Sequence, residues 1–235
     1  MLTVRGLKKT FGGLVALKGV DVDVPDRSIL GVIGMNGSGK TTMLNCVNGI
    51  YKPDAGKITL DGQSILGEPV HRIAKLGIGR TFQVPRVFQR MTLLENMDVA
   101  QVNSAAGNDE RDALADYWLD KVGLLRLRHN YAEELSGGQQ KLVELARIMV
   151  ARPKVILLDE PFAGVNPELA QMLIGIIRSI PQEHGCSVVL VSHDLTSIYQ
   201  LSHHIIVMNE GAILTQGDAA TVKSDPAVVE AYLGA

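Results

Sequence analysis

With 235 residues, 46% of them hydrophobic, the chain can build one sizeable core with at most a small appended subdomain. A formal net charge of −2 argues against a nucleic-acid binder that depends on a strong basic field. The two cysteines, Cys46 and Cys186, fit a reducing compartment and small buried apolar positions better than a disulfide scaffold.

Neither a signal peptide nor a membrane span is expected. The N-terminal residues Met-Leu-Thr-Val-Arg lack the charged start and the long apolar region of a signal peptide. The apolar runs at 155–158, 188–191 and 205–208 have the length of strands, well short of the ~20 residues that a membrane span needs. We therefore expect a soluble protein that reaches a membrane only through a partner.

The N-terminal part of the chain is predicted to be rich in strands. Residues 1–33 follow strand patterns, with Asp21–Val24 as a half-exposed example. Residues 28–33 form a continuous apolar run, which is typical of a strand buried on both faces. Residues 40–48 indicate a helix, and residues 58–64 resemble a strand closed by an Asp-Gly turn.

The remainder of the chain alternates between helices and strands. From about residue 85 to 150 the pattern is helical, interrupted by a polar stretch at 103–109 that indicates a loop. Strands at 155–158 and 188–191 then flank a helix over 167–180. Such alternation indicates a mostly parallel sheet. We predict one domain over 1–235, with the helical segment of about 85–150 inserted as a second lobe and no further domain after residue 235.

The first motif is Gly34-Met-Asn-Gly-Ser-Gly-Lys-Thr41, here called the phosphate loop, which fits Gly-x-x-x-x-Gly-Lys-Thr between a strand and a helix. Its glycines let backbone N–H groups turn toward phosphate oxygens, and the helix N-terminus adds positive potential. Lys40 is expected to reach the β- and γ-phosphates and Thr41 to ligate Mg²⁺. The alternative is a glycine-rich turn that only caps a helix. The nucleotide contacts predicted in this region are Gly34, Asn36, Gly37, Ser38, Gly39, Lys40, Thr41 and Thr42.

The second motif is a pair of acids, Asp159 and Glu160, that ends the apolar run 155–158. Ligands bind at this end of the strands in open parallel sheets. Asp159 would hold Mg²⁺ through water, and Glu160 would orient the water that attacks the γ-phosphate. The alternative is that two acids end a strand and meet solvent. The presence of the phosphate loop favours the catalytic interpretation.

The third motif is Leu135-Ser-Gly-Gly-Gln139, here called the signature segment, which begins a helix. Ser136 is a natural N-cap, and Gly137 and Gly138 expose backbone N–H groups. The local interpretation is a good helix cap, and the functional one is an anion site for a γ-phosphate made by Ser136, Gly137, Gly138 and Gln139. The helical lobe would hold this helix away from the phosphate loop of its own chain. A second subunit would therefore have to supply it.

The order of phosphate loop, Gln83, signature segment, Asp159-Glu160 and His193 makes the sequence resemble the ATPase subunits of ABC transporters over essentially its whole length. The resemblance implies an α/β fold of the P-loop NTPase class, with a mostly parallel sheet, an N-terminal antiparallel β subdomain and an inserted helical lobe. It also implies a head-to-tail dimer with two ATP molecules at the interface.

The resemblance assigns roles to three further residues. Phe11 matches the aromatic that stacks on adenine, Gln83 the glutamine that senses Mg²⁺ and links to the membrane domain, and His193 the histidine that contacts the γ-phosphate. The alternatives are a core aromatic, an ordinary loop amide and a satisfied strand-end histidine. The catalytic residues expected are Lys40, Gln83, Glu160 and His193, and the residues expected at Mg²⁺ are Thr41, Gln83 and Asp159.

Local features narrow the resemblance further. Residues 80–88, 91–96, 161–167 and 231–235 look like importers of branched-chain amino acids, with urea or amide importers and the lipopolysaccharide-export ATPase as near relatives. Two positions depart from the common pattern. Asn166 stands where many members have Asp, in the loop that crosses to the partner subunit, and Lys141 replaces a frequent Arg.

The expected function is an ATP-driven clamp that closes around two ATP molecules and opens on hydrolysis. The partners implied are membrane permease subunits, a second ATPase subunit and, indirectly, an extracytoplasmic substrate-binding protein, with the chain peripheral at the cytoplasmic face of the inner membrane. Residues 84–88 would line a groove for a short permease helix, or else pack inward. A soluble ABC ATPase, such as an iron–sulfur assembly factor, remains an alternative. The intact Lys40, Asp159, Glu160 and His193 argue against a non-catalytic ATP-binding subunit.

Overall fold

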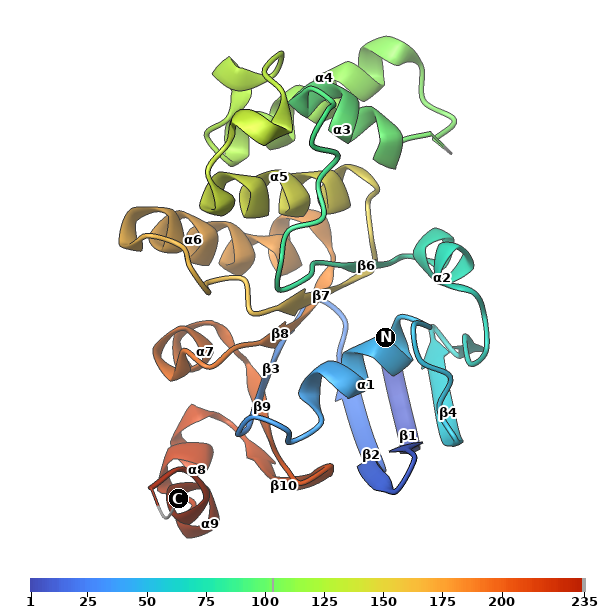
Figure 1. Ribbon diagram of the computed structural model, residues 1–235, viewed down its shortest axis with the longest axis vertical. Coiled ribbons are helices and arrows are strands. Elements are labelled where there is room, and N and C mark those ends of the chain that lie inside the picture. The colour runs from blue at the N-terminus through green and yellow to red at the C-terminus, as the bar shows by residue number, and fades with distance from the viewer. Residues whose placement is uncertain (103, 234–235) are drawn as a thin grey trace.

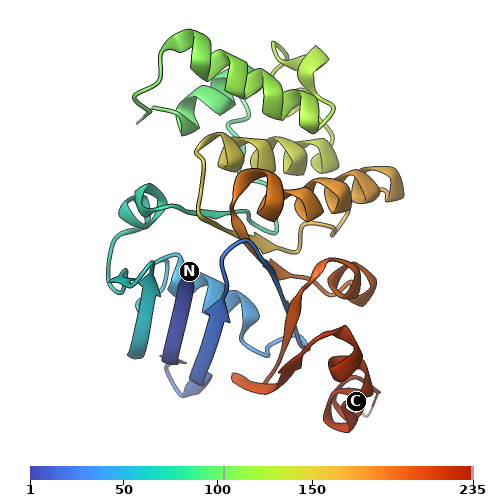
Figure 2. The same ribbon diagram turned by 180° about the vertical axis from the view of Figure 1, so that it is seen from behind.

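The structure is a computed structural model that describes residues 1–102 and 104–233. A mixed six-stranded sheet crosses the molecule, with a helical lobe above it and a smaller antiparallel sheet beside its lower half (Figure 1). The view from behind shows the same separation into lobe, central sheet and N-terminal sheet (Figure 2). This arrangement confirms the α/β fold predicted from the sequence.

The six-stranded sheet carries the parallel strands that the apolar runs predict. Every neighbouring pair is parallel except the pair at one edge, β9 (His204–Asn209) with β10 (Ala212–Gly217). All side chains of β3, β7 and β8 are buried, as expected for strands covered on both faces. In sheet order the strands are β10 (Ala212–Gly217), β9 (His204–Asn209), β3 (Ile29–Ile33), β8 (Ser187–Val191), β7 (Val155–Asp159) and β6 (Ile78–Arg80).

The N-terminal sheet is antiparallel, in the order β2 (Leu14–Val24), β1 (Leu2–Phe11), β4 (Ala55–Leu60) and β5 (Gln63–Ser64). The predicted turn at Asp61-Gly62 joins β4 to β5, and both turn residues have positive φ. Helix α1 (Lys40–Val47) lies between this sheet and the central one (Figure 1). One hydrophobic cluster joins α1 to both sheets, so the phosphate loop is fixed between two rigid layers.

The helical lobe is built on α5 and is packed around Trp118, which is only 2% exposed. A second hydrophobic cluster joins this lobe to the other face of the central sheet. Its helices are α3 (Leu93–Ala100), α4 (Asn108–Lys121) and α5 (Gly137–Val150), with the 3-10 turns η1 (Leu125–Leu127) and η2 (Ala132–Glu134) between α4 and α5.

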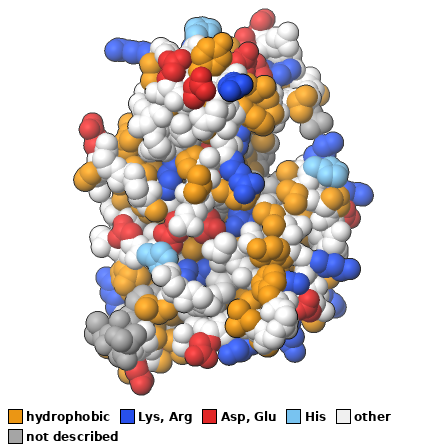
Figure 3. Space-filling model, in the orientation of Figure 1, with side chains coloured by type: hydrophobic (Ala, Val, Ile, Leu, Met, Phe, Trp, Pro, Cys, Tyr) orange, Lys and Arg blue, Asp and Glu red, His pale blue; other side chains and the backbone are white. Residues whose placement is uncertain are grey.

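The remaining helices cover the sheet and its edges. They are α2 (Val70–Leu76), α6 (Pro167–His184), α7 (Leu195–Leu201), α8 (Ala219–Ser224) and α9 (Pro226–Leu233). Within the described part of the chain, none of the helices is both long and apolar enough to span a bilayer. On the face seen in Figure 3, Lys and Arg side chains are interspersed with Asp and Glu.

Two boundaries differ from the prediction. Helix α6 continues four residues past Ile180, through Pro181, to a C-cap at Gly185 in the left-handed conformation. Proline gives up one backbone hydrogen bond there, but Ile177, Ile180 and Pro181 are buried against the sheet, so packing holds the turn. The predicted loop 103–109 is shorter, because Asn108 and Asp109 already belong to α4. Asn103 lies outside the described residues.

Replacing Trp118 by Ala should lower the free energy of unfolding by about 3–5 kcal/mol, because a large buried side chain leaves a cavity. Urea denaturation of the purified protein measures this. Tyr117→Ala is the matched control, since this neighbouring aromatic is 41% exposed and should cost much less. Equal losses for the two variants would contradict the packing described here.

Candidate nucleotide site

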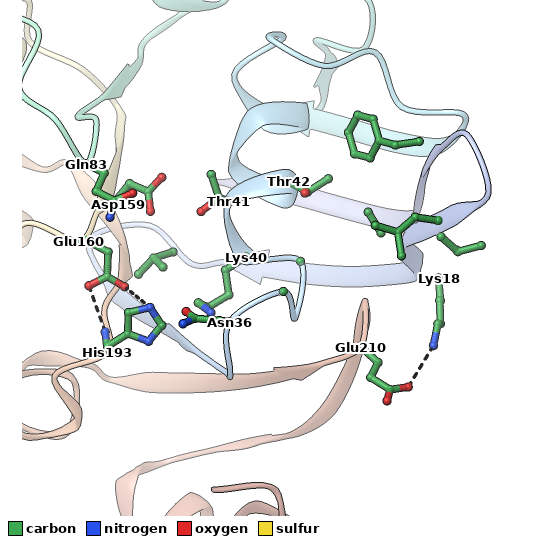
Figure 4. Close-up of a pocket in the computed structure, with 17 residues that line it drawn as sticks. Lys18, Asn36, Lys40, Thr41, Thr42, Gln83, Asp159, Glu160, His193 and Glu210 are labelled. Atoms are coloured by element: carbon green, nitrogen blue, oxygen red, sulfur yellow. Dashed lines mark hydrogen bonds and ion pairs between the residues drawn. The ribbon is translucent and has the colours of Figure 1, made fainter. Parts of the chain in front are cut away.

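Four strands of the central sheet end at one edge, and the sequence motifs follow those ends. The phosphate loop follows β3, His193 follows β8, Asp159 and Glu160 end β7, and Gln83 follows β6. Strand β8 lies between β3 and β7, which confirms that the strand before His193 neighbours the Asp159 strand. Together they border a cavity of about 650 Å³. Figure 4 shows Gln83, Asp159, Glu160 and His193 facing Lys40 and Thr41 across it.

The phosphate loop has the backbone geometry that only glycine permits. Gly34, Gly37 and Gly39 all have φ between +81° and +152°. A Cβ on Gly34 would lie 2.2 Å from the Met208 carbonyl oxygen, whereas one on Gly37 would meet nothing within 4 Å. Gly34 is therefore fixed by packing against β9, and Gly37 by the turn itself.

Lys40 and the start of α1 give the loop its positive charge. The Lys40 ammonium donates hydrogen bonds to the carbonyl oxygens of Gly34 (2.7 Å) and Met35 (2.9 Å). Burial lowers the pKa of Lys40, while the charges of Glu160 and Asp159 oppose that shift. The N-cap residue Gly39 provides no side-chain acceptor for the first-turn N–H groups of α1, which leaves them for an anion.

Asp159 is held by a partner that the sequence analysis did not single out. Its Oδ2 atom lies 3.2 Å from Nη2 of Arg80, and both side chains are buried. Arg80 also donates to Oδ1 of Asn45 on α1 at 2.6 Å. Burial lowers the pKa of Arg80, and Asp159 opposes that shift. The ion pair therefore ties the end of β7 to β6, and Asn45 ties it to α1.

Glu160 lies in a strained but well-defined position. Its φ is +51°, which is rare for a residue with a side chain, and its N–H donates to the Val191 carbonyl at 2.9 Å. The His193 N–H donates to Glu160 Oε2 at 3.2 Å, and His193 Nε2 lies 3.3 Å from Glu160 Oε1 (Figure 4). These contacts hold the carboxylate at the cavity wall, opposite the phosphate loop.

The far end of the cavity is more apolar. Phe11 is 40% exposed, and Tyr51 packs edge-on against it, with ring centroids 5.1 Å apart. Lining residues that the sequence analysis missed are Leu14, Val15, Ala16, Lys18, Val191 and Glu210. They come from β2, β8 and the β9–β10 turn, and no local motif marks them; only the pairing of the sheets brings them here.

The predicted site residues fall into two groups. The structure brings Phe11, Asn36, Gly37, Gly39, Lys40, Thr41, Thr42, Gln83, Asp159, Glu160 and His193 to one cavity. Gly34 and Ser38 belong to the loop but lie behind its lining surface, and Ser38 is buried.

The signature segment lies elsewhere. Ser136 caps α5 in a capping box with Gln139, but none of residues 136–139 lines the cavity. Figure 1 shows α5 in the lobe above β7 and α1 lower down beside β3, and the two helices pack on opposite faces of the central sheet. This separation is the one expected from an inserted helical lobe.

Residues 84–88, hypothesised to line a groove for a permease helix, include both exposed and inward-packed side chains. Val84 is 76% exposed and Phe88 is 45% exposed, whereas Val87 packs against the core of the lobe. The Arg147 guanidinium lies 5.1 Å from the centre of the Phe88 ring. Val87 thus follows the inward-packing alternative, and Val84 does not.

Comparison with known proteins decides the family. The family model described as "ABC transporter" matches residues 17–163. The chain belongs to the ABC transporter family. The resemblance drawn from the motifs is therefore confirmed, and the protein is an ATP-binding cassette. A second model, described as "Branched-chain amino acid ATP-binding cassette transporter", matches residues 212–235 of the cassette.

Relatives match the cassette over its full length. The high-affinity branched-chain amino acid transport ATP-binding protein BraF of Pseudomonas aeruginosa is 41% identical, with 100% of this chain and 98% of that protein covered. The corresponding protein LivG of Salmonella typhimurium is 38% identical at the same coverage.

Solved structures agree with this assignment. A nucleotide-free ATP-binding cassette from an ABC transporter superposes with a TM-score of 0.89 at 32% identity, covering 100% of this chain and 99% of that one. A dimeric cassette in a post-hydrolysis state, bound to ADP and Pi, has a TM-score of 0.84 at 26% identity, with 93% and 98% covered.

Replacing Arg80 by Leu should destabilise the cassette by about 3–5 kcal/mol, because the buried Asp159 carboxylate loses its counter-charge. Thermal and urea unfolding measure the loss. Arg72→Leu is the matched control, since Arg72 is exposed, its partner Glu68 is only half-buried, and ion pairs near the surface contribute little. An Arg80→Leu protein as stable as the control would show that the ion pair does not hold β7 to β6.

Proposed function

We propose that the cassette hydrolyses ATP between two subunits and thereby drives the import of branched-chain amino acids through a membrane permease. The observation that supports the shared site is the split described above: one cavity holds the phosphate loop and Glu160, while the signature segment opens elsewhere on the same chain. A head-to-tail partner would bring its own Ser136–Gln139 to this cavity. The capped helix start would then offer backbone N–H groups to the γ-phosphate.

Within one cavity, a few side chains would bind the nucleotide and position the attacking water. The adenine would stack on the exposed face of Phe11, and the phosphates would lie in the phosphate loop with Lys40 donating to the β- and γ-phosphates. A bound phosphate would replace the loop carbonyls that Lys40 contacts in this structure. Glu160 would then orient the attacking water, and His193, which holds Glu160 from the neighbouring strand end, would keep the carboxylate in place.

The oxygen donors of this cavity fit Mg²⁺. Thr41, Gln83 and Asp159 line the same cavity and offer a hydroxyl, an amide and a carboxylate oxygen. Among the described residues no group of three or more His, Cys, Asp or Glu could hold a metal by itself, which suits an ion held mostly by phosphates and water. When bound, Mg²⁺ neutralises charge on the phosphates.

The transport role rests on the relatives. The proteins that match the whole chain at 41% and 38% identity are named as high-affinity branched-chain amino acid transport ATP-binding proteins. We infer a peripheral subunit at the cytoplasmic face of the membrane, which pairs with a second cassette and with permease subunits, and which receives cargo through an extracytoplasmic binding protein. Gln83 and the exposed Val84 would face the permease.

Affinity purification of the tagged cassette from detergent-solubilised native membranes tests the partners, and reconstitution of the purified complex tests the cargo. We expect permease subunits to co-elute and ATP-dependent uptake of radiolabelled leucine. Uptake of urea instead of leucine would contradict the cargo assignment. Recovery of soluble partners alone would contradict the transporter role and favour an assembly-factor ATPase.

The variant Glu160→Gln should retain ATP, lose turnover and accumulate as a closed dimer, because the water loses its base while the phosphate contacts remain. Light scattering after size exclusion, with ATP or with ADP, measures the dimer. Glu68→Gln, which changes a half-buried glutamate just before α2 that does not line the cavity, is the control and should hydrolyse ATP like wild type without accumulating as a dimer. Undiminished turnover in Glu160→Gln would remove Glu160 from the mechanism.

A further inference from the structure

Gln83, Val84 and Pro85 form the tip of a loop whose two ends are held together. Gln83 lines the nucleotide cavity, and Val84 is among the most exposed apolar side chains of the described chain. The residues on either side of this tip are Phe82 and Arg86. Both of their backbone N–H groups donate to one side chain, Glu144 of α5.

Glu144 is a buried carboxylate that lies between the two ends of this loop. It is 1% exposed and accepts from the Arg86 N–H on Oε1 at 2.9 Å and from the Phe82 N–H on Oε2 at 3.3 Å. Burial raises the pKa of Glu144, while these two hydrogen bonds and the nearby Arg147 and Lys141 oppose the shift. A buried carboxylate persists where such bonds compensate its lost hydration. Here its two oxygens hold Phe82 and Arg86, the two ends of the loop, close together.

Helix α5 is bonded to the site at further points. Lys141 donates to the carbonyl oxygens of Glu160 (2.9 Å) and Ala163 (2.7 Å), just past the end of β7. Arg147 donates to the Arg86 carbonyl oxygen. The same helix therefore contacts the Glu160 backbone through Lys141 and the Gln83 loop through Glu144 and Arg147.

Asn96 fixes the other side of the loop. It is fully buried, accepts from the Phe88 N–H at 2.9 Å, and donates to the carbonyl oxygens of Phe88 and Thr92. Residues 88–92 are thus bound to α3, and residues 82 and 86 to α5. Only the tip, Gln83 to Pro85, lies outside these anchors.

We propose that Glu144 is a positioning residue that fastens the Gln83 tip to α5, so that the tip moves with the helix whose N-terminus binds the partner's ATP. This inference rests on the proposed function for the role of Ser136–Gln139 across the dimer. It adds a specific connection. When the nucleotide in the partner's phosphate loop binds the N-terminus of α5, Glu144 transmits the movement of α5 to the tip that faces the permease. Glu160 is reached separately, through Lys141.

A substitution of Glu144 can separate its hydrogen bonding from its packing. Both carboxylate oxygens accept hydrogen bonds, whereas a glutamine of the same shape has one acceptor oxygen and one NH₂ donor. Glu144→Gln therefore keeps the packing but cannot bind both N–H groups. One of the two hydrogen bonds that hold residues 82 and 86 should be lost, so the tip with Gln83 becomes more mobile. The phosphate loop, Asp159, Glu160 and His193, none of which bonds to the Glu144 side chain, should keep their places in the cavity.

Two readouts test the proposal in Glu144→Gln, with Glu110→Gln, an exposed glutamate of α4, as the matched control. In the isolated cassette, hydrogen exchange of peptides covering 82–86 should speed up, while KM for ATP and basal kcat stay within about two-fold of wild type. In the reconstituted complex, the part of ATPase activity that leucine and its binding protein stimulate should fall several-fold.

Unchanged exchange at 82–86, or full stimulation despite faster exchange, would overturn the proposal, as would a loss of basal kcat equal to the loss of stimulation. If Glu144→Gln does not fold, Arg147→Met removes the bond to the Arg86 carbonyl and should show the same pattern more weakly. A wild-type complex that leucine does not stimulate refutes the proposed cargo, whereas the exchange measurement still tests the role of Glu144.

Discussion

Parallel pairing of β3, β8, β7 and β6 is the constraint on which the site depends. Parallel strands all end at the same edge, so four segments far apart in the sequence meet there: the phosphate loop, His193, the Asp159-Glu160 pair and Gln83. The buried pair of Arg80 with Asp159 then fixes β6 against β7 at that edge. Without this pairing the motifs would be unrelated loops.

The same architecture leaves the site incomplete within one chain. The lobe that carries α5 packs on one face of the sheet, and α1 packs on the other. The signature segment is well formed as a helix cap, but it does not line the cavity of its own chain. If the signature segment binds ATP as proposed, a second subunit has to supply it, and the lobe that carries α5 would connect the two sites.

Much of this could be predicted from the sequence, because the informative features are local. The phosphate loop, the capped signature helix and the acids at the end of an apolar run each depend on a short pattern of residue types. Arg80, Asn45 and Glu144 could not be found in this way. Their partners are 79, 35 and up to 62 positions distant along the chain, and only the folded sheet and lobe bring them together. Lys141 stood out in the sequence only as a replacement for a frequent Arg, yet its ammonium donates a hydrogen bond to the Glu160 carbonyl oxygen.

Two predicted helix boundaries were wrong for a related reason. Pro181 reads as a helix stop, but the buried face of α6 continues past it, and tertiary packing outweighs the lost hydrogen bond. The loop before α4 is shorter than its polar composition indicates, because Asn108 and Asp109 serve as the first residues of that helix, where acidic side chains are favourable.

Mixing two inactive cassettes tests the shared site most directly. Lys40→Ala damages only the phosphate loop, and Gly137→Asp places a carboxylate in open space at the signature segment, where it would repel a γ-phosphate. If ATP lies between subunits, a mixed dimer contains one intact site, so ATPase activity should reappear on mixing. If each chain holds ATP alone, the mixture stays inactive while the wild-type cassette is active, and the account is contradicted.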